Sequence, residues 1–557
     1  MTSDTPPANN KPVTPGSLKE TVTNELERLE TTNKWVWALF FLCFSPNILN
    51  GFHVSSYVLL AHISNDMWCT IPQLKDSNWT TEEMRNISST GLTSKGCTVL
   101  DWDYSQLGHM TFTEAWEHTQ TNGRPKEVSC QSSSIGGSYE FENPLSSIVP
   151  EWNLVCEKAV SRTSAQVSVS IGKFLGASIF GIMSDKFGRK TTFVLASAVY
   201  IISSIITTVS PWYTLFLAGR FGLGASASGI FYPAFALLSE NIGVGHRSRM
   251  SIAFSASYPV GMLFLALVGY LIEPWRYLQL ALTIPGFLLI LNCYLMFESP
   301  RWLLSKDRVA DAYRVVFKKK ANLQLDNIPS EKQKEAESQK PATLSTKLLG
   351  SVNELKNLYG ESKMRRMAFT CYFMWCVVSL CYYVTALNAN NLAANRFVYV
   401  LITGCVDLPC YLLPMILLRF MGRKTAAFTL FTLAGISLLI VLAIPQENVS
   451  LLVFFAMFGR FGISAVYSIV TLHTAELFPT EIRNSALGTC STMAHIGSIT
   501  APYIVDVLGL LGWFIPTTIC GCSILVAGLL MLTLPETGKR NLVDHVKDEV
   551  ECKNDKQ

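Results

Sequence analysis

The sequence predicts an all-α polytopic membrane protein with twelve transmembrane helices in two six-helix halves and an extracellular disulfide-bearing loop. Three observations lead to this prediction. The 557 residues are 49% hydrophobic and only 15% charged, whereas soluble domains carry roughly 25% charged residues. Apolar runs of membrane-spanning length recur along the chain, and short motifs of its first half return in order in its second half.

Twelve apolar runs are long enough to cross the hydrocarbon core of a bilayer, which is about 30 Å thick. They lie near residues 36–62, 161–183, 191–209, 212–236, 250–271, 277–296, 367–388, 396–418, 425–444, 451–473, 486–508 and 512–534. About 35 mostly polar residues precede the first run and no small-residue cleavage site follows it, so we interpret it as a transmembrane helix and not a signal peptide.

The charges of the loops predict the orientation. Residues 298–366 hold 15 Lys and Arg against 9 Asp and Glu, whereas residues 64–151 hold 5 against 12. The short loops decide, because long loops translocate largely regardless of their charge. Their basic residues all fall on the side of 298–366: Lys186, Arg189, Lys190, Arg247, Arg249, Arg419, Arg423 and Lys424. We therefore expect a multi-pass protein of the plasma membrane with both termini in the cytoplasm.

The first long loop has the features of an extracellular segment. It is acidic, and its four cysteines predict two disulfides, with three connectivities left open: Cys69, Cys97, Cys130 and Cys156. The sequons Asn78-Trp-Thr and Asn86-Ile-Ser lie in the same loop, so Asn78 and Asn86 are expected to carry glycans.

The two halves repeat the same motifs in the same order. Gly-Arg-Phe-Gly begins at residue 219 in span four and at residue 459 in span ten. A glutamate followed seven residues later by an arginine occurs as Glu240 and Arg247 after span four, and as Glu476 and Arg483 after span ten. A duplicated six-span unit predicts two bundles around a central cavity, rocking against each other.

Residues 181–190 read Gly-Ile-Met-Ser-Asp-Lys-Phe-Gly-Arg-Lys and are expected to form a loop between spans two and three, where glycines permit a tight turn. The loop resembles the signature loop of the major facilitator superfamily of membrane transporters. We expect Asp185 to face the positive end of a neighbouring helix as a conformational latch. Arg419 replaces it in the second half, so the latch is expected in the first half only. The conformational residues are Gly181, Asp185, Lys186, Gly188, Arg189, Lys190, Glu240, Arg247, Glu476 and Arg483.

Further motifs narrow the resemblance to one family. They are Glu-Trp-Asn-Leu-Val-Cys at 151–156, Glu-Ser-Pro-Arg-Trp-Leu-Leu at 298–304, Ala-Glu-Leu-Phe-Pro-Thr-Glu-Ile-Arg-Asn at 475–484 and Leu-Pro-Glu-Thr at 534–537. Together with the cysteine-bearing outer loop, they resemble the organic cation/anion/carnitine transporter family over residues 35–540. That resemblance implies the major facilitator fold and transport of small organic ions by alternating access.

Three ionisable residues inside predicted spans are candidates for substrate binding, since such residues are rare and usually functional. Lys173 lies twelve residues before Asp185, so about 18 Å along the helix and near mid-membrane. Asp407 matches an acidic residue typical of the family and is expected to pair with Lys173, Arg220 or a cationic substrate group. Relatives that carry cations often have Asp at the position of His495, and anion and carnitine relatives often have Arg. A histidine there can change its charge at physiological pH.

Aromatic residues complete the candidate site. The resemblance implies that they line the central cavity, where aromatic faces attract quaternary ammonium and aryl groups: Phe231, Phe235, Trp375, Tyr382 and Tyr467. Arg220 and Arg460 occupy corresponding places in the halves and are expected to be structural, holding carbonyls or carboxylates across the bundle.

The sequence contains no Walker loop, HExxH or GxSxG motif, so we expect neither an enzyme nor an ATP-driven pump, and no catalytic residue, cofactor or metal. The net charge of +4 suggests no nucleic-acid partner. The expected partners are the lipid bilayer, a small organic ion, and a coupling ion (sodium or a proton) or a counter-substrate. We favour an organic cation or carnitine-like zwitterion as substrate. An organic anion is the alternative, and a non-transporting sensor is a further one.

The expected domain organisation follows from the spans and loops. It comprises a cytoplasmic segment 1–34, an N-terminal half 35–297 with the extracellular loop 63–160, a cytoplasmic link 298–366, a C-terminal half 367–535 and a cytoplasmic tail 536–557.

Overall fold

A computed structural model describes most of the membrane-embedded chain. The described residues are 21–24, 34–62, 67–88, 96–121, 123, 125–242, 244–306, 308–317, 358–392, 395–479 and 482–537. The sequence also predicts a helical piece near residues 17–31, of which only the helical residues 21–24 are described, and a polar portion of the link near 321–346, which lies outside the described residues.

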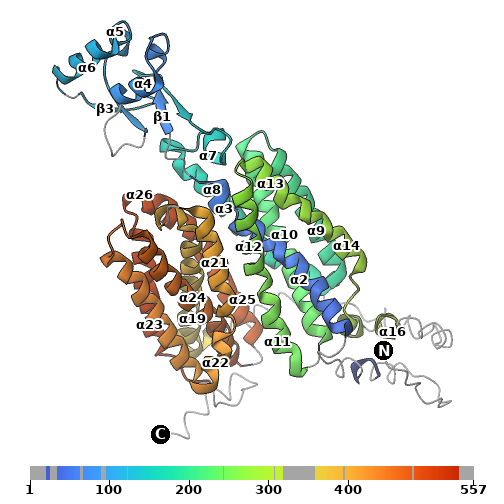
Figure 1. The fold of residues 1–557 in the computed structure, drawn as a ribbon. Coiled ribbons are helices and arrows are strands. Elements are labelled where there is room, and N and C mark those ends of the chain that lie inside the picture. The colour runs from blue at the N-terminus through green and yellow to red at the C-terminus, as the bar shows by residue number, and fades with distance from the viewer. Residues whose placement is uncertain are drawn as a thin grey trace, which may run out of the picture.

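The transmembrane part consists of two helical bundles that lie side by side (Figure 1). The first bundle contains α2 (Lys34–Ser55), α3 (Tyr57–Leu60), α8 (Ala159–Phe187), α9 (Arg189–Val209), α10 (Tyr213–Asn241), α11 (Val244–Ser255), α12 (Ser257–Leu271), α13 (Trp275–Thr283), η3 (Ile284–Phe287) and α14 (Leu288–Leu295). The second contains α19 (Ser362–Leu387), α20 (Ala389–Leu392), α21 (Arg396–Cys410), α22 (Leu413–Phe420), α23 (Arg423–Ile440), η5 (Val441–Ala443), α24 (Val449–Leu477), α25 (Arg483–Tyr503), η6 (Ile504–Leu508), α26 (Gly509–Leu511) and α27 (Ile515–Met531).

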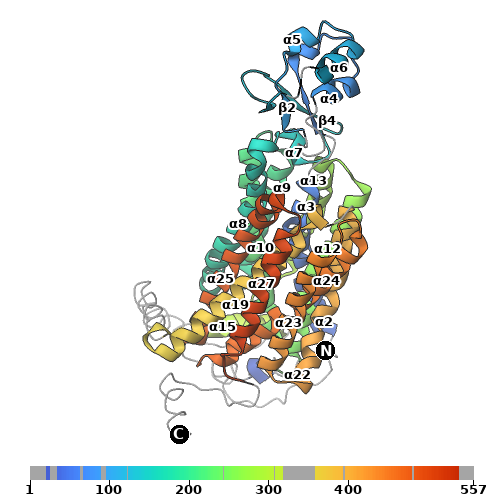
Figure 2. The ribbon, with the colours of Figure 1, turned by 90° about the vertical axis from the view of Figure 1, so that its left-hand side faces the viewer.

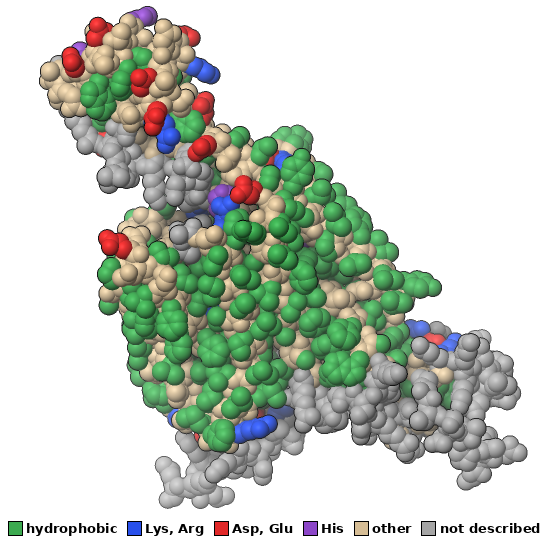
Figure 3. All heavy atoms as spheres, viewed as in Figure 1, with side chains coloured by type: hydrophobic (Ala, Val, Ile, Leu, Met, Phe, Trp, Pro, Cys, Tyr) green, Lys and Arg blue, Asp and Glu red, His purple; other side chains and the backbone are tan. Residues whose placement is uncertain are grey.

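The spans agree with the predicted apolar runs. Among the described residues, 11 helices are long and apolar enough to cross a membrane, and the last run forms the shorter apolar helix Ile515–Met531. Large apolar side chains such as Tyr294 and Phe420 are exposed on the outside of the bundles. In Figure 3 the flank of the bundles is largely hydrophobic, and the charged side chains gather above and below it. This surface fits lipid contact, since water would disfavour so large an apolar patch.

The two halves meet along two helix pairs. Helix α8 packs against α25, and α12 packs against α21. Within the halves, α10 packs on α8 and α9, and α24 packs on α19 and α23. A cavity between the halves is therefore bounded by α8 and α25.

A small domain, formed by the first long loop, projects from one end of the bundles (Figures 1 and 2). Its elements are β1 (Met67–Thr70), η1 (Pro72–Leu74), α4 (Thr81–Ser88), β2 (Thr98–Leu100), α5 (Tyr104–Leu107), α6 (Phe112–Thr121), β3 (Glu127–Ser129), β4 (Ser138–Phe141), α7 (Ile148–Glu151) and η2 (Cys156–Lys158). Two antiparallel strand pairs form, with Trp68 opposite Glu140 on β1 and β4, and Val99 opposite Val128 on β2 and β3.

Two disulfides hold this domain together and select one of the three connectivities. They join Cys69 to Cys130 and Cys97 to Cys156, across 61 and 59 residues. Loops of this length stabilise a fold by roughly 4 kcal/mol each, on the chain-entropy estimate, because they restrict the unfolded chain. The side chains of Asn78 and Asn86 are exposed on the domain's surface.

The link between the halves begins with two short helices, α15 (Pro300–Ser305) and α16 (Val309–Phe317). Trp302 and Leu303 of α15 and Tyr313 of α16 are buried in a small cluster that also contains Val22. The start of the link therefore packs against the N-terminal segment at Val22.

Candidate functional site

A cavity of about 440 Å³ lies between α8, α10 and α25. Its volume falls within the range of about 300–1,000 Å³ that is typical of small-molecule sites. The lining residues come from both halves: Phe174, Ala177, Ser178, Gly181, Ser184, Asp185, Arg189, Tyr232, Phe235, Ala236, Gly488, Ser491, Thr492 and His495. Because Asp185 and Arg189 lie at the α8–α9 turn, the cavity extends to that end of the bundles.

Helices α8 and α25 run antiparallel and touch at their outer ends. The Ser170 hydroxyl donates to the Ser498 carbonyl at 3.3 Å, and the rings of Phe174 and His495 lie 5.7 Å apart. Farther along, Gly181 and Gly488 line the cavity, and a Cβ added at either glycine would meet no atom within 4 Å. The helices therefore diverge from His495 towards the α8–α9 turn.

Of the candidate aromatic residues, Phe235 lines the cavity. Phe231 stacks on it with ring centroids 6.0 Å apart, as their spacing on one helix face predicts. Trp375 is buried, and its indole N–H donates to Thr474 Oγ1 at 3.0 Å. Tyr467 lies against Trp375, with ring centroids 5.8 Å apart. Phe231, Trp375 and Tyr467 are absent from the cavity wall in this state, and so is Tyr382.

Lys173 lies where the two halves meet, and it is not among the residues that line the cavity. Its Nζ donates to Tyr383 Oη of α19 at 3.2 Å, and it lies 5.8 Å from the centroid of that ring. No carboxylate of the described residues lies within 4.0 Å of Nζ. The Lys173 ammonium group therefore has one hydroxyl partner, Tyr383, and no paired carboxylate among the described residues.

His495 contacts the cavity and lies near Lys173. Its ring lines the cavity and packs on Phe174, and the Lys173 ammonium acts on it electrostatically. Lys173 and His495 therefore lie close together on the neighbouring helices α8 and α25.

The prediction that Asp407 pairs with Lys173, Arg220 or a cationic substrate group is wrong. Its carboxylate pairs with Arg460 of its own half: Oδ2 accepts from Nη2 at 2.7 Å and Oδ1 from Nε at 3.1 Å. Ser464 and Tyr382 also donate to it, at 3.0 and 3.1 Å. The side chains of Asp407 and Arg460 are almost fully buried. A buried carboxylate needs this paired and hydrogen-bonded environment, so its charge is already compensated.

Arg220 has the structural role expected from the sequence, and its partners differ from those of Arg460. Its guanidinium donates to the His53 carbonyl at 3.1 Å and to Ser56 Oγ at 2.9 Å. It also donates to Gln166 Oε1 at 3.3 Å. Arg220 thus holds α2, α8 and α10 together with neutral acceptors, whereas Arg460 uses a carboxylate.

The signature stretch is mostly helical, which corrects the loop predicted at 181–190. Helix α8 continues through Phe187 and α9 begins at Arg189, so Gly188 alone forms the turn. Its φ of +102° is a conformation that L side chains rarely adopt, and an added Cβ would lie 2.3 Å from Glu298 Oε2. Gly181, Asp185 and Lys186 therefore lie on the last turns of α8.

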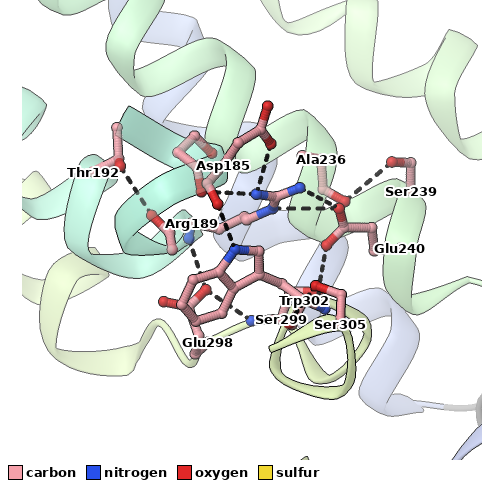
Figure 4. A network of polar contacts seen from close by, with 12 residues as sticks. Asp185, Arg189, Thr192, Ala236, Ser239, Glu240, Glu298, Ser299, Trp302 and Ser305 are labelled. Atoms are coloured by element: carbon pink, nitrogen blue, oxygen red, sulfur yellow. Dashed lines mark hydrogen bonds and ion pairs between the residues drawn. The ribbon is translucent and has the colours of Figure 1, made fainter. Parts of the chain in front are cut away.

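A polar network fastens this turn to the end of the half (Figure 4). Glu298 accepts from the backbone N–H of Arg189 at 2.7 Å. The Arg189 guanidinium donates to Glu240 Oε1 at 2.8 Å, and Ser299 Oγ donates to Glu240 Oε2. Such acceptors suit the N-terminus of α9, whose first N–H groups have no partner within the helix.

Among the described residues, Asp185 forms its ion pair and hydrogen bonds within the first half and the start of the link. Its side chain is 80% exposed and pairs with Arg189 at 3.0 Å. Its carbonyl accepts from the Trp302 indole at 3.0 Å. The latch contact predicted for Asp185 is therefore not formed in this state.

The second half repeats the network without the aspartate. Glu536 accepts from the N–H groups of Arg423 and Lys424 at 2.8 and 3.0 Å. The Arg423 guanidinium pairs with Glu476 at 3.3 Å. Arg483 begins α25, and the side chain of Arg247 lies outside the described residues.

Sequence reasoning missed several residues that contact the site. Phe174 and Tyr232 line the cavity, and Tyr383 binds Lys173. Phe174 follows Lys173 directly and lies four residues before Ser178 on α8, so helical spacing offered a signal for it. Tyr383 belongs to the second half, so no local sequence pattern indicates its contact with Lys173.

Comparisons with known proteins agree with this architecture. The family profile described as "Sugar (and other) transporter" matches residues 102–546. The organic cation transporter protein of Drosophila melanogaster is 32% identical over 524 residues, covering 92% of this chain and 91% of that protein. The human organic cation/carnitine transporter 2 is 32% identical over 429 residues, covering 76% and 75%.

Solved structures show the same fold. The crystal structure of a D-xylose-proton symporter matches with a TM-score of 0.57 at 14% identity, covering 92% of this chain and all of the symporter chain. At this identity the likeness concerns the fold alone. The family profile and the relatives thus assign the chain to a family of membrane transporters, and the solved structure shows the same fold.

Proposed function

The chain belongs to the organic cation/anion/carnitine transporter family of the major facilitator superfamily, and on that premise we propose that it carries a carnitine-like zwitterion across the plasma membrane. Transport occurs by alternating access, in which the site between the halves faces each side in turn. The observation that carries the substrate class is the ammonium group of Lys173, which lies between the halves without a paired carboxylate among the described residues.

A carboxylate group of the substrate would provide the missing partner. Lys173 Nζ has a tyrosine hydroxyl as acceptor, and a hydroxyl compensates a buried positive charge less well than an anion does. A substrate carboxylate at Nζ would form a charge-assisted hydrogen bond. It would also lie close to His495, whose imidazole can donate.

The ammonium end of a zwitterion would face aromatic rings. Tyr232 and Phe235 line the cavity, and Phe174 packs on His495 beside them. Ring faces attract quaternary ammonium groups, by about 0.5–2 kcal/mol for each well-placed contact. The cavity lining thus combines aromatic groups of α8 and α10 with the polar His495 of α25.

An organic anion is the second candidate. Asp407, the acidic residue that would have attracted a cation, is compensated by Arg460, Ser464 and Tyr382. A plain cation would therefore meet Lys173 without an available carboxylate. Relatives whose names include organic cations and carnitine favour the zwitterion over the anion.

We assign the domains as the sequence predicts, with the loop 63–160 outside the cell and the segments 1–34, 298–366 and 536–557 in the cytoplasm. The two disulfides and exposed sequons of the outer domain support this orientation. Four transport modes remain open: facilitated transport, exchange, sodium symport and proton symport. The uptake experiment below varies sodium and external pH, and so tests coupling to sodium and to protons.

The test is radiotracer uptake in cells expressing the chain, comparing carnitine, tetraethylammonium and para-aminohippurate. Each is measured with and without sodium, and at two external pH values. We expect uptake of carnitine above that of the other two. Uptake of the hippurate alone would replace the zwitterion by the anion, and uptake of tetraethylammonium alone would remove the role of Lys173.

Replacing Lys173→Met sharpens this test. We expect carnitine uptake per surface molecule to fall at least about tenfold, equivalent to roughly 1.4 kcal/mol, because the carboxylate loses its partner. Tetraethylammonium uptake is expected to hold or rise, since a repulsive charge is gone. Lys158→Met is the matched control, because Lys158 is an exposed lysine directly before α8. Equal loss of both substrates in Lys173→Met would contradict the proposal.

A further inference from the structure

A buried polar cluster joins the two halves at the outer end of the bundles. Asp506 Oδ1 pairs with Arg162 Nη2 at 2.9 Å, and both side chains are 4% exposed. Asp506 Oδ2 accepts from Thr163 Oγ1 at 3.2 Å and from the Tyr57 hydroxyl. We propose that Tyr57, Arg162, Thr163 and Asp506, here called the outer latch, hold the external entrance closed and must separate whenever the transporter opens outward.

The latch differs from the other ion pairs by joining the halves. Tyr57, Arg162 and Thr163 belong to α3 and α8 of the first half, and Asp506 to η6 of the second. The remaining ion pairs between described residues each lie within one half or within the link. Opening the outside therefore breaks this pair and leaves the others intact.

The local structure of the second half is built to present Asp506. Pro502 lies at the end of α25 and has no N–H, so it leaves the Ser498 carbonyl without its helical donor. That carbonyl instead accepts from Ser170 of the first half. The chain then forms the π-helical turn η6, which contains Asp506. Single π turns within helices occur frequently at functional sites.

The latch lies outward of the substrate region. Arg162 precedes Lys173 by eleven residues on α8, so the two are about 16 Å apart along the helix. Between them, Ser170 and Ser498 are buried in the α8–α25 contact. At the other end of the same helix pair, the cavity reaches Asp185. The structure thus combines a closed outer end with an open inner end.

The chemistry of a buried ion pair suits a latch. Once both charges are out of water, each depends on the other, so removing one strands its partner. When α8 and η6 move apart, water enters and hydrates both groups, which makes the separated state accessible. Arg162 and Asp506 therefore favour the outward-closed state without preventing opening. The inference requires alternating access only, and holds whichever substrate is carried.

The test measures how fast an externally added, membrane-impermeant thiol reagent reaches a cysteine placed behind the latch. Ser170→Cys is the reporter, since Ser170 is buried inward of Arg162. With the latch intact we expect slow labelling. Adding Asp506→Asn should raise the labelling rate about tenfold, because the outward-open population grows. The charge-exchanged pair Arg162→Asp with Asp506→Arg should return the rate towards the slow value.

Matched controls keep the result decisive. Glu151→Gln breaks the Glu151–Arg276 pair, which lies at the outer end but within the first half, and should leave reporter labelling unchanged. Cells with the parent chain lacking the reporter give the background from native cysteines. If Asp506→Asn fails to reach the surface, Tyr57→Phe removes one donor and keeps both charges, and a smaller rise is expected. Unchanged labelling in a latch variant at the surface would overturn the proposal, even if carnitine uptake were as proposed.

Discussion

The turn before α9 in the first half and the turn before α23 in the second half share one backbone arrangement and differ in one charge. In the first half Glu298 accepts from the N-terminus of α9, and in the second Glu536 accepts from the N-terminus of α23. Both halves also pair the first arginine of that helix with a glutamate. Only the first half has an aspartate at the turn, since Arg419 replaces Asp185. The two halves therefore share the glutamate contacts that hold the start of α9 or α23. They differ in the charged residue at the turn, which is Asp185 in the first half and Arg419 in the second.

The buried arginines of the two halves, Arg220 and Arg460, diverge in the same way. Arg460 binds the Asp407 carboxylate, whereas Arg220 binds carbonyls, a hydroxyl and the amide of Gln166. Both guanidinium groups are fully buried. Duplication thus preserved the need to cross-link helices by a buried arginine, while each half satisfied the charge with different acceptors.

The largest difference is expected when the acceptor of each arginine is removed. Asp407→Leu leaves the Arg460 charge buried without its partner and should destabilise the protein by about 3–5 kcal/mol. Gln166→Leu removes one neutral acceptor of Arg220 and should cost about 1–2 kcal/mol. Thermal unfolding of the detergent-purified protein measures both. The double variant Asp407→Leu with Arg460→Met should recover part of the loss, and equal effects of the two single variants would contradict the comparison.

The turn glycines provide an intermediate effect. Gly188 has a φ of +102°, so Gly188→Ala adds backbone strain to the clash with Glu298, at roughly 1–3 kcal/mol. Gly422 has an ordinary φ of −67°, and Gly422→Ala meets only the Glu536 carboxylate, at 2.4 Å. We expect the first variant to lower the unfolding temperature more than the second. A larger loss for Gly422→Ala would show that steric contact outweighs the backbone conformation.

The smallest effect on stability is expected at the divergent charge. Asp185 is mostly exposed in this state, so Asp185→Asn should change stability by less than about 1 kcal/mol. It should nevertheless slow uptake, because its proposed partner is the positive end of a helix in the inner-closed state. Arg419→Gln in the second half should leave uptake near the parent rate. Similar slowing by both variants, at equal surface levels, would contradict the proposed difference between Asp185 and Arg419.

The sequence predicted the membrane fold well because its signals are strong and local. Lipid contact demands long apolar runs, and each of the twelve predicted runs corresponds to a helical segment of the structure. It predicted the turn less well, since residues 181–187 are polar enough to suggest a loop but continue α8. The error arose because the hydrogen bonds from Arg189 and Trp302 that support this helix end come from outside it.

The candidate site was predicted in part. Lys173, Phe235 and His495 were recognised as polar or aromatic residues within spans, and they lie at the contact of α8, α10 and α25. Asp407 was assigned the wrong partner, because its proximity to Arg460 depends on how α21 packs against α24. The role proposed for Asp506 depends equally on contacts with α3 and α8, hundreds of residues away.

The sequence by itself determined the number of spans, the duplication and the family, because hydrophobic length and repeated motifs are properties of continuous segments. Only the tertiary structure decided which of the three disulfide connectivities forms, which arginine neutralises Asp407, and that Arg162 of the first half pairs with Asp506 of the second. The physical reason is that the energy of a buried charge depends on the groups brought within a few ångströms of it, and in this protein those groups come from different helices and, at the latch, from different halves.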